Sequence, residues 1–291
     1  MKVGLLLSLT GEERFQHMMN FKLVLKRLKR WVFPDQPPIG EVFESTDAPT
    51  FASSHQPGMA RSTGRESPIF DAFSSAEKSS TKWTHYFDIY DECLVPLRDW
   101  LASTATAPGV LEIGSAHGGS LLMWKSFFGN SSVVRGVDLA PKELNFDDSQ
   151  ISVVVGSQTD ENVLHTAVTA LPNLHLVIDD GSHVGRHQKQ SFEYLWPRLA
   201  DGGLYVVEDL HTAYWKEYER GIFRRRKSSF IDYAKRLVDV QHSHYSSRRK
   251  NQFEREQICD SIFSISFYDS VVVIRKEKMP KSRSKISNRR S

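Results

Sequence analysis

The chain has few cysteines and no long apolar run. Two cysteines among 291 residues are too few for a disulfide framework, and their spacing matches no zinc motif. We therefore expect a reducing, cytoplasmic setting. No apolar stretch of the sequence is long enough to span a bilayer. The apolar segment 1–10 is too short for a secretion signal, and charged residues follow it at once.

The chain also lacks a strong net charge, because its basic residues gather at one end. The formal net charge is +3, yet residues 275–291 alone carry eight Lys or Arg side chains and one acid. Such an end can contact nucleic acid or anionic lipid, but a solubilising, disordered tail is the more common case. Residues 276–291 are therefore predicted to be a disordered basic tail, and no nucleic-acid partner is favoured.

The N-terminal part divides into a helix and a linker. Over residues 19–33, apolar residues repeat at helical spacing with Lys and Arg between them, which predicts a basic amphipathic helix within an extension formed by residues 1–33. Such a helix can lie on a membrane, or pack on its own domain or on a second copy of the chain, and the sequence leaves these alternatives open. Residues 34–80 are rich in Pro, Ser, Gly and Thr and are predicted to be a linker.

Strand-like and helix-like segments alternate over residues 81–275, which predicts a parallel sheet with crossover helices. A tight turn at Tyr268-Asp269 joins the last two strands, so an antiparallel pair is expected at one edge. The predicted fold class is α/β, with a doubly wound, mostly parallel, seven-stranded sheet. The expected strands are 109–113, 133–137, 151–155, 174–178, 204–208, 262–267 and 270–275, and the expected helices are 119–128, 160–170 and 185–198.

A glycine-rich turn follows the first of these strands. Residues 110–120 read Val-Leu-Glu-Ile-Gly-Ser-Ala-His-Gly-Gly-Ser, and the next strand ends in Asp138. Glycines let the backbone approach a ligand closely, and an acid at the tip of the second strand is placed to accept hydrogen bonds from a ribose. The spacing excludes the G-x-G-x-x-G dinucleotide motif, and the lack of a following Gly-Lys-Ser/Thr excludes a P-loop.

The pattern acid-x-Gly-x-x-x-Gly resembles motif I of the class I S-adenosylmethionine (SAM) methyltransferases. The resemblance implies that Gly114, Gly118 and Gly119 shape the turn below the amino-acid part of SAM. Glu112 would then accept a hydrogen bond from the cofactor ammonium, and Asp138 would hold the ribose.

Two further positions are candidates for the cofactor. In this fold the turn after the third strand flanks the adenine, which suggests Ser157 and Gln158. The alternative is a plain strand-to-helix turn in which Asp160 caps the helix. Asp179, at the tip of the fourth strand, is also assigned to cofactor binding.

Acidic residues stand at the ends of the fourth and fifth strands. Asp180, Glu208 and Asp209 are expected to lie together, because the carboxyl ends of parallel strands meet at the ligand-binding edge of the sheet. Such a cluster raises its own pKa values unless a cation neutralises it, and oxygen ligands favour Mg²⁺. The alternative is that Asp180 and Asp209 only cap helices.

His183 lies three residues after Asp180. An imidazole titrates near neutrality and can take the proton from a metal-bound hydroxyl, so His183 is the predicted general base. His183 and His187 form an H-x-x-x-H pair that lacks the Glu of the zincins, which argues against zinc. Weaker candidates for substrate contacts are His117, His211, Tyr214 and Trp215. The last two fit either an aromatic wall for a sugar or the core.

Three segments, 179–183, 208–215 and 267–274, resemble the metal-dependent sugar O-methyltransferases that modify glycosylated macrolides and related products. Residues 81–86 are similar to the segment that precedes motif I in that family. The resemblance covers roughly residues 81–275 and does not extend to the N-terminal part. It implies SAM and Mg²⁺ as cofactors and assigns the site residues as follows: Asp180, Glu208 and Asp209 as metal ligands and His183 as the base.

The resulting hypothesis is a Mg²⁺-dependent O-methyltransferase acting on a sugar hydroxyl of a glycosylated natural product or a glycoconjugate, with a small-molecule or lipid-linked glycan acceptor. One alternative is a catechol-type O-methyltransferase, a family that places a lysine near the first acid, whereas no Lys lies between Asp180 and Arg186. The other is an interaction protein with a degenerate SAM fold that binds a membrane surface or nucleic acid through residues 19–33 and the tail. A homo-oligomer is compatible with each.

Overall fold

The computed structural model describes residues 67–142, 145–215, 229–243, 258 and 260–278. All of them lie within one compact unit, Gln56–Ser291. The predicted helix 19–33 and almost all of the basic tail lie outside the described residues. Within the described part of the chain, no helix is long and apolar enough to cross a membrane.

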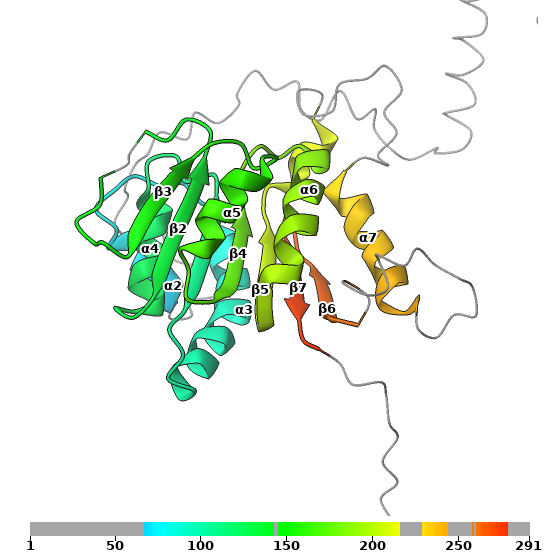
Figure 1. Ribbon diagram of the computed structural model, residues 1–291, viewed down its shortest axis with the longest axis horizontal. Helices are drawn as coiled ribbons and strands as arrows, with labels where there is room; N and C mark the ends of the chain where they lie inside the picture. The colour runs from blue at the N-terminus through cyan, green and yellow to red at the C-terminus, as the bar shows by residue number, and fades with distance from the viewer. Residues whose placement is uncertain (1–66, 143–144, 216–228, 244–257, 259, 279–291) are drawn as a thin grey trace, which may run out of the picture. The chain divides into compact units, whose positions relative to one another are not determined.

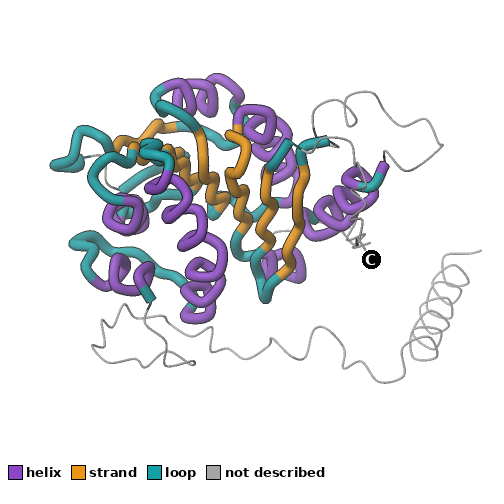
Figure 2. Tube along the Cα trace, turned by 90° about the horizontal axis from the view of Figure 1, so that it is seen from below, coloured by secondary structure: helices purple, strands orange, loops and turns teal. Residues whose placement is uncertain are grey.

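One seven-stranded sheet forms the centre of this unit, with helices on both faces (Figures 1 and 2). Across the sheet the strands are β3 (Ile151–Val155), β2 (Val133–Asp138), β1 (Gly109–Ile113), β4 (Leu174–Asp179), β5 (Leu199–Val207), β7 (Val272–Lys276) and β6 (Ile262–Phe267). The first five are parallel, and β7 is antiparallel to both of its neighbours. The predicted fold class, including the antiparallel pair at the edge, is confirmed.

The helices divide between the two faces of the sheet (Figure 1). One face is covered by α5 (Glu161–Thr169), α6 (Gly185–Leu195) and α7 (Phe230–Gln241), and the other by α2 (Pro68–Ser74), α3 (Thr84–Ser103) and α4 (Gly119–Phe128). Alternate residues of the central strands point to opposite faces. In β5, for example, Tyr205 belongs to the hydrophobic core on the face covered by α5, α6 and α7, and Val206 belongs to the core on the opposite face. Burial on both faces explains why these strands read as nearly continuous apolar runs.

Several elements differ from the sequence prediction, among them helix α7, which was not expected. Helix α2 lies inside the predicted linker 34–80, where no regular element was expected. Ser67 caps it by accepting a hydrogen bond from the Phe70 amide at 3.0 Å, and Ile69 is fully buried. Strand β5 begins at Leu199 rather than at residue 204. In the sequence Gly202 and Gly203 suggest a turn, but both lie within the strand.

The order of the strands places the ligand-binding edge. Strand β1 lies between β2 and β4, so the chain leaves it in one direction and later returns on its other side. In doubly wound sheets the crevice at such a reversal, beyond the carboxyl ends of the strands, is where ligands bind. The backbone there is tightly joined: the Asp180 amide donates to Ile113 O at 2.9 Å, and the Glu208 amide donates to Asp179 O at 3.0 Å.

Candidate functional site

The glycine turn between β1 and α4 is packed against other backbone. Gly114 has φ +90°, and a Cβ there would overlap the carbonyl of Asp180. Gly119 allows the carbonyls of Lys78 and Ser79 to approach in the same way. Gly118 has φ +79° and is the cap residue immediately before helix α4. The glycines predicted to shape the cofactor turn are therefore also required by the way this turn meets its neighbours.

Asp138 lies at the tip of β2 and supports the same turn. Its Oδ2 accepts a hydrogen bond from the Ala116 amide and its Oδ1 one from the Ala140 amide, each at 2.8 Å. Ala116 adopts φ 41°, a left-handed conformation that is unusual for a residue with a side chain. The carboxylate is half-buried. Its assignment to the ribose stays a prediction.

Glu112 is fully buried at the base of the turn. Its Oε2 accepts from the Ser120 hydroxyl at 2.5 Å, while its Oε1 has no hydrogen-bond partner among the described residues and lies 3.7 Å from Lys82 Nζ. Burial raises the pKa of Glu112 to about 7, although Lys82 and Ser120 act in the opposite direction. A buried acceptor that lacks a donor is costly, and the ammonium of SAM would satisfy it.

Asp179 and Gln158 are held by each other. Gln158 Nε2 donates to Asp179 Oδ1 at 3.1 Å, the Ser191 hydroxyl donates to Asp179 Oδ2 at 3.0 Å, and the Ser182 amide donates to Gln158 Oε1 at 2.8 Å. Burial raises the pKa of Asp179 to about 6. The pair anchors the end of β4, so its assignment to the cofactor stays a prediction.

The turn after β3 contains the other candidates. Asp160 caps α5, accepting from the Asn162 amide at 2.9 Å, so the capping alternative is confirmed for this residue. The Ser157 hydroxyl lies 2.9 Å from that of Thr159. Ser157 is half-buried, and its contact with adenine stays a prediction.

Asp180, His183 and Asp209 come together at the carboxyl ends of β4 and β5. Each offers one ligand atom, and these atoms all lie within 4.8 Å of one another. His183 Nε2 is 3.8 Å from Asp209 Oδ2. We call these three residues the metal cluster. His183 and Asp209 both have φ 54°, a left-handed conformation that is uncommon for residues with a side chain.

Glu208 was predicted as a metal ligand, but the structure does not bring it into the metal cluster. It is buried between Lys82 Nζ at 2.6 Å and the Tyr90 hydroxyl at 2.5 Å. Burial, and then the charge of Asp180, raise the pKa of Glu208 to about 8, while Lys82 lowers it. His183 occupies the third position instead. The metal role of Glu208 therefore stays a prediction that requires Lys82 to move.

Lys82 is the residue that sequence reasoning missed. Its side chain is 2% exposed, and its amine lies 2.7 Å from Asp180 Oδ2 and 2.6 Å from Glu208 Oε2. Burial alone lowers the pKa of this amine, but the charges of Asp180 and Glu208 outweigh burial and hold the pKa well above its ordinary value. Lys82 is thus a cation in this arrangement. The only signal for it was its place in the segment 81–86, which resembles the sugar O-methyltransferases.

A chain of hydrogen bonds fixes Asp209 from its other side. The Tyr86 hydroxyl lies 2.7 Å from Asp209 Oδ1 and 3.0 Å from Ser270 Oγ, and the same Ser270 oxygen lies 2.6 Å from His211 Nδ1. Tyr86 belongs to α3, and Ser270 belongs to the turn between β6 and β7. The metal cluster is therefore held by elements from both ends of the described chain.

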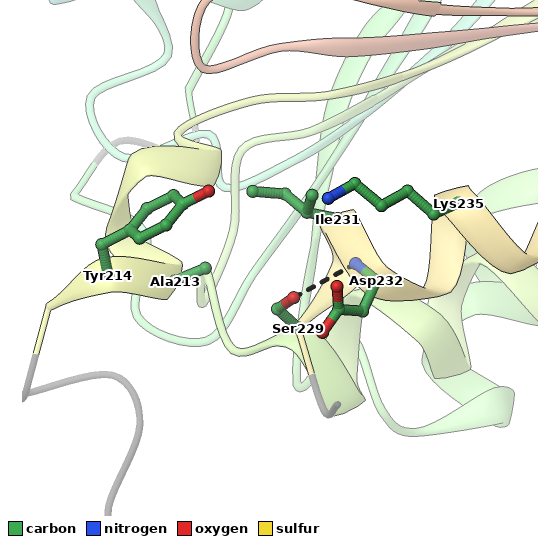
Figure 3. Close-up of a pocket in the computed structure, with 6 residues that line it drawn as sticks. All are labelled: Ala213, Tyr214, Ser229, Ile231, Asp232 and Lys235. Carbon is green, nitrogen blue, oxygen red and sulfur yellow. Dashed lines mark hydrogen bonds between the residues drawn. The ribbon is translucent and has the colours of Figure 1, made fainter. Parts of the chain in front are cut away.

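The weaker candidates lie at the surface. His117 is exposed, and Tyr214 and Trp215 are 44% and 37% exposed, so core packing does not account for these two aromatic residues. Tyr214 and Ala213 line a small pocket with the start of α7, where the Tyr214 ring points toward Ile231 (Figure 3). His187 is outside the metal cluster, with its Nδ1 3.0 Å from the Ser182 hydroxyl.

The fold and the site are similar to those of known methyltransferases. Residues 111–210 match a family described as "Methyltransferase domain". The chain is 37% identical over 200 residues to the 8-demethyl-8-alpha-L-rhamnosyl tetracenomycin-C 2'-O-methyltransferase of Streptomyces olivaceus, which covers 65% of this chain and 50% of that protein. It is 42% identical over 113 residues to the Mycinamicin VI 2''-O-methyltransferase of Micromonospora griseorubida. This match covers 36% of this chain and 28% of that protein. The predicted resemblance to the sugar O-methyltransferases is confirmed.

A solved structure supports the same resemblance. The MycE methyltransferase from the mycinamycin biosynthetic pathway, in complex with Mg and SAH (S-adenosylhomocysteine), has a TM-score of 0.61 at 27% identity, over 74% of this chain and 55% of that chain. A further complex of MycE, with Mg, SAH and mycinamycin VI, has a TM-score of 0.59. The chain spans about half the length, or less, of the relatives named above.

Proposed function

We propose that this protein is a SAM-dependent, Mg²⁺-dependent O-methyltransferase that acts on a sugar hydroxyl of a glycosylated natural product. The observation that carries the proposal is the metal cluster of Asp180, His183 and Asp209 at the carboxyl edge of the sheet. Beside it lies the glycine turn with the buried acceptor Glu112. The two relatives named above are both methyltransferases whose names place the methyl group on a sugar position.

The residues present fit both cofactors. The carboxylates of Asp180 and Asp209 form a donor set suited to a hard divalent ion, and the imidazole of His183 lies within 4.8 Å of both. The unsatisfied Oε1 of Glu112 suits the ammonium of SAM. When bound, SAM supplies the methyl group and the metal ion lowers the pKa of the acceptor hydroxyl.

The chain's own residues then have distinct roles. His183 accepts the proton of the reacting hydroxyl at Nε2, the atom that lies 3.8 Å from Asp209. Asp180 and Asp209 would hold the metal ion. In the metal-free arrangement, the charges of Asp180 and Glu208 hold the pKa of the Lys82 amine well above its ordinary value, so this amine is a cation rather than a base. Much of the rate gain is expected from alignment of the reacting atoms.

The position of the Lys82 amine bears on the catechol-type alternative. In the sequence, the absence of a lysine soon after Asp180 argues against a catechol-type enzyme. The fold nevertheless places the Lys82 amine 2.7 Å from Asp180 Oδ2. The preference for a sugar acceptor now rests on the relatives, whose names specify rhamnosyl tetracenomycin and mycinamicin. Methyl transfer to glycosides measured beside transfer to catechols decides between the two acceptors.

Membrane contact and self-association are further proposals. The basic helix predicted over residues 19–33 lies outside the described residues, as does most of the basic tail. Its binding to a membrane, for example near a lipid-linked glycan, is tested by cosedimentation with anionic vesicles at rising salt, since electrostatic attachment weakens with ionic strength. The same assay tests the alternative in which the protein only binds partners.

Calorimetry with SAH, with and without Mg²⁺, tests the proposed function. Wild-type protein is expected to bind both, and Asp180→Ala is expected to bind SAH while losing Mg²⁺. A folded protein that binds no SAH would remove the proposal and favour the interaction alternative.

A further inference from the structure

Two exposed tryptophans from distant parts of the chain, Trp83 and Trp215, pack against the same residue, His211. Trp83 is 42% exposed and Trp215 is 37% exposed. The ring of His211 packs against both, with centroid distances of 4.9 Å and 4.8 Å. We call Trp83, His211 and Trp215 the aromatic strip. Apolar side chains gathered at the surface in this way mark a binding site more often than isolated ones do.

Helix capping does not explain the exposed indole of Trp83. This residue precedes the first turn of α3 with an extended backbone and makes no side-chain hydrogen bond to the helix. Ser, Thr, Asp and Asn are the residues that stabilise this position. Trp100, near the other end of α3, is 43% exposed, but its ring covers Gly202. Trp100 therefore has a packing role and serves as a matched control.

The aromatic strip is fixed relative to the metal cluster. His211 Nδ1 is 2.6 Å from Ser270 Oγ, and the Tyr86 hydroxyl lies 3.0 Å from that oxygen and 2.7 Å from Asp209 Oδ1. Trp83 follows Lys82, whose amine is paired with Asp180. His211 in the middle of the strip and Trp83 at one end are thus each tied to a carboxylate of the site through neighbouring residues.

Resting on the proposed function, we propose that the aromatic strip is the subsite for the acceptor sugar. The apolar face of the sugar ring, which carries C–H groups, packs on Trp83 and His211. One hydroxyl at the edge of the ring reaches His183. Ligand sites are commonly lined by aromatic walls with a few convergent polar groups, which is the arrangement here. Rings contribute apolar contact area without needing a charged partner, which suits an uncharged sugar.

Ligand-observed NMR tests this subsite with a defined probe, methyl α-L-rhamnopyranoside. The full chain loaded with SAH and Mg²⁺ is expected to transfer saturation mainly to the C–H protons of the probe. In Trp83→Ala the affinity for the probe should fall by about fivefold or more, the loss typical of one aromatic contact. Trp83→Phe should retain most of the affinity, and Trp100→Ala should match wild type.

The affinity for SAH, measured by calorimetry, is expected to be the same in all four proteins. Unchanged binding of the probe to Trp83→Ala would overturn the subsite, as would no binding of the probe to SAH-loaded wild type. Preferential binding of pyrocatechol on Trp83 would also overturn it as a sugar subsite. If the probe binds through Trp83 while no glycoside is methylated, the subsite stands and the proposed function fails.

Discussion

The Lys82 amine lies 2.6 Å from Glu208 Oε2, and both side chains are almost completely buried. The same amine contacts Asp180. One lysine just before α3 therefore neutralises the acids that directly follow β4 and β5. A cluster of acids at a sheet edge is unstable without a nearby cation. In the metal-free arrangement Lys82 supplies that cation. Glu208 is consequently directed to Lys82 rather than to the metal cluster.

Lys82→Met is expected to destabilise the metal-free protein by about 3–5 kcal/mol, because removing one partner leaves a buried charge without compensation. Urea denaturation in the presence of EDTA measures the change. In the double variant Lys82→Met/Glu208→Gln, part of the loss should be recovered. Arg98→Met, which removes the surface pair with Asp99, is the control and should change stability by less than about 1 kcal/mol. A small effect of Lys82→Met would contradict its role as counter-ion.

Gly114→Ala is expected to abolish tight SAH binding. The new Cβ would overlap the Asp180 carbonyl and displace the turn that meets the cofactor. Gly129→Ala is the matched control, since Gly129 has a similar φ of +86° but open space around its Cβ position. It should lose about 1–3 kcal/mol of stability, because its ψ of 178° belongs to a backbone region open essentially to glycine alone, and it should keep its affinity for SAH. Equal SAH affinity in the two variants would show that the turn does not form the cofactor site.

The stability of the metal-free protein should fall as the pH rises toward neutrality. Burial raises the pKa of Glu112 from 4.5 to about 7 and that of Asp179 from 3.8 to about 6. At a pH between the ordinary and the raised pKa of either group, the folded state binds more protons than the unfolded state. The stabilisation is therefore present below about pH 4 and is lost as the pH rises through the folded pKa values. Glu112→Gln should flatten this dependence, as measured by denaturation at a series of pH values; an identical slope would contradict it.

His183→Ala is expected to retain Mg²⁺ and SAH binding and to lose about 10²- to 10⁴-fold in turnover, the usual effect of removing a general base. Its position within 4.8 Å of two carboxylates also suits a metal ligand. Calorimetry separates these roles, since a ligand variant binds Mg²⁺ more weakly and a base variant does not. Asp209→Asn is the comparison that should weaken Mg²⁺ binding.

Most of the sheet could be predicted because its central strands are buried on both faces and because glycine-rich or polar turns separate the strands. Strands β1, β3 and β6 begin and end where the sequence indicates. Helix α2 was missed because it is only seven residues long and has two buried residues, Ile69 and Ala72, too few for a periodic signal. The early start of β5 was hidden by its internal glycines.

The site was predicted in part for a similar reason. Asp180, His183 and Asp209 sit at strand ends, where local sequence and general topology place them together. Lys82 stands 98 residues before Asp180, and no local pattern reports a contact of that separation. Its ion pair with Glu208 decides which carboxylates remain available, so the ligand set could not be derived from spacing alone.

The central claim, metal-dependent methylation of a sugar hydroxyl, is tested most directly by methyl transfer from labelled SAM to a rhamnosylated polyketide, with product analysis by NMR. The account predicts a methyl ether on the sugar, loss of transfer with EDTA and recovery with Mg²⁺. It also predicts no recovery by Mg²⁺ in Asp180→Asn. Transfer that is unaffected by EDTA, or a methyl group on the aglycone, would contradict it.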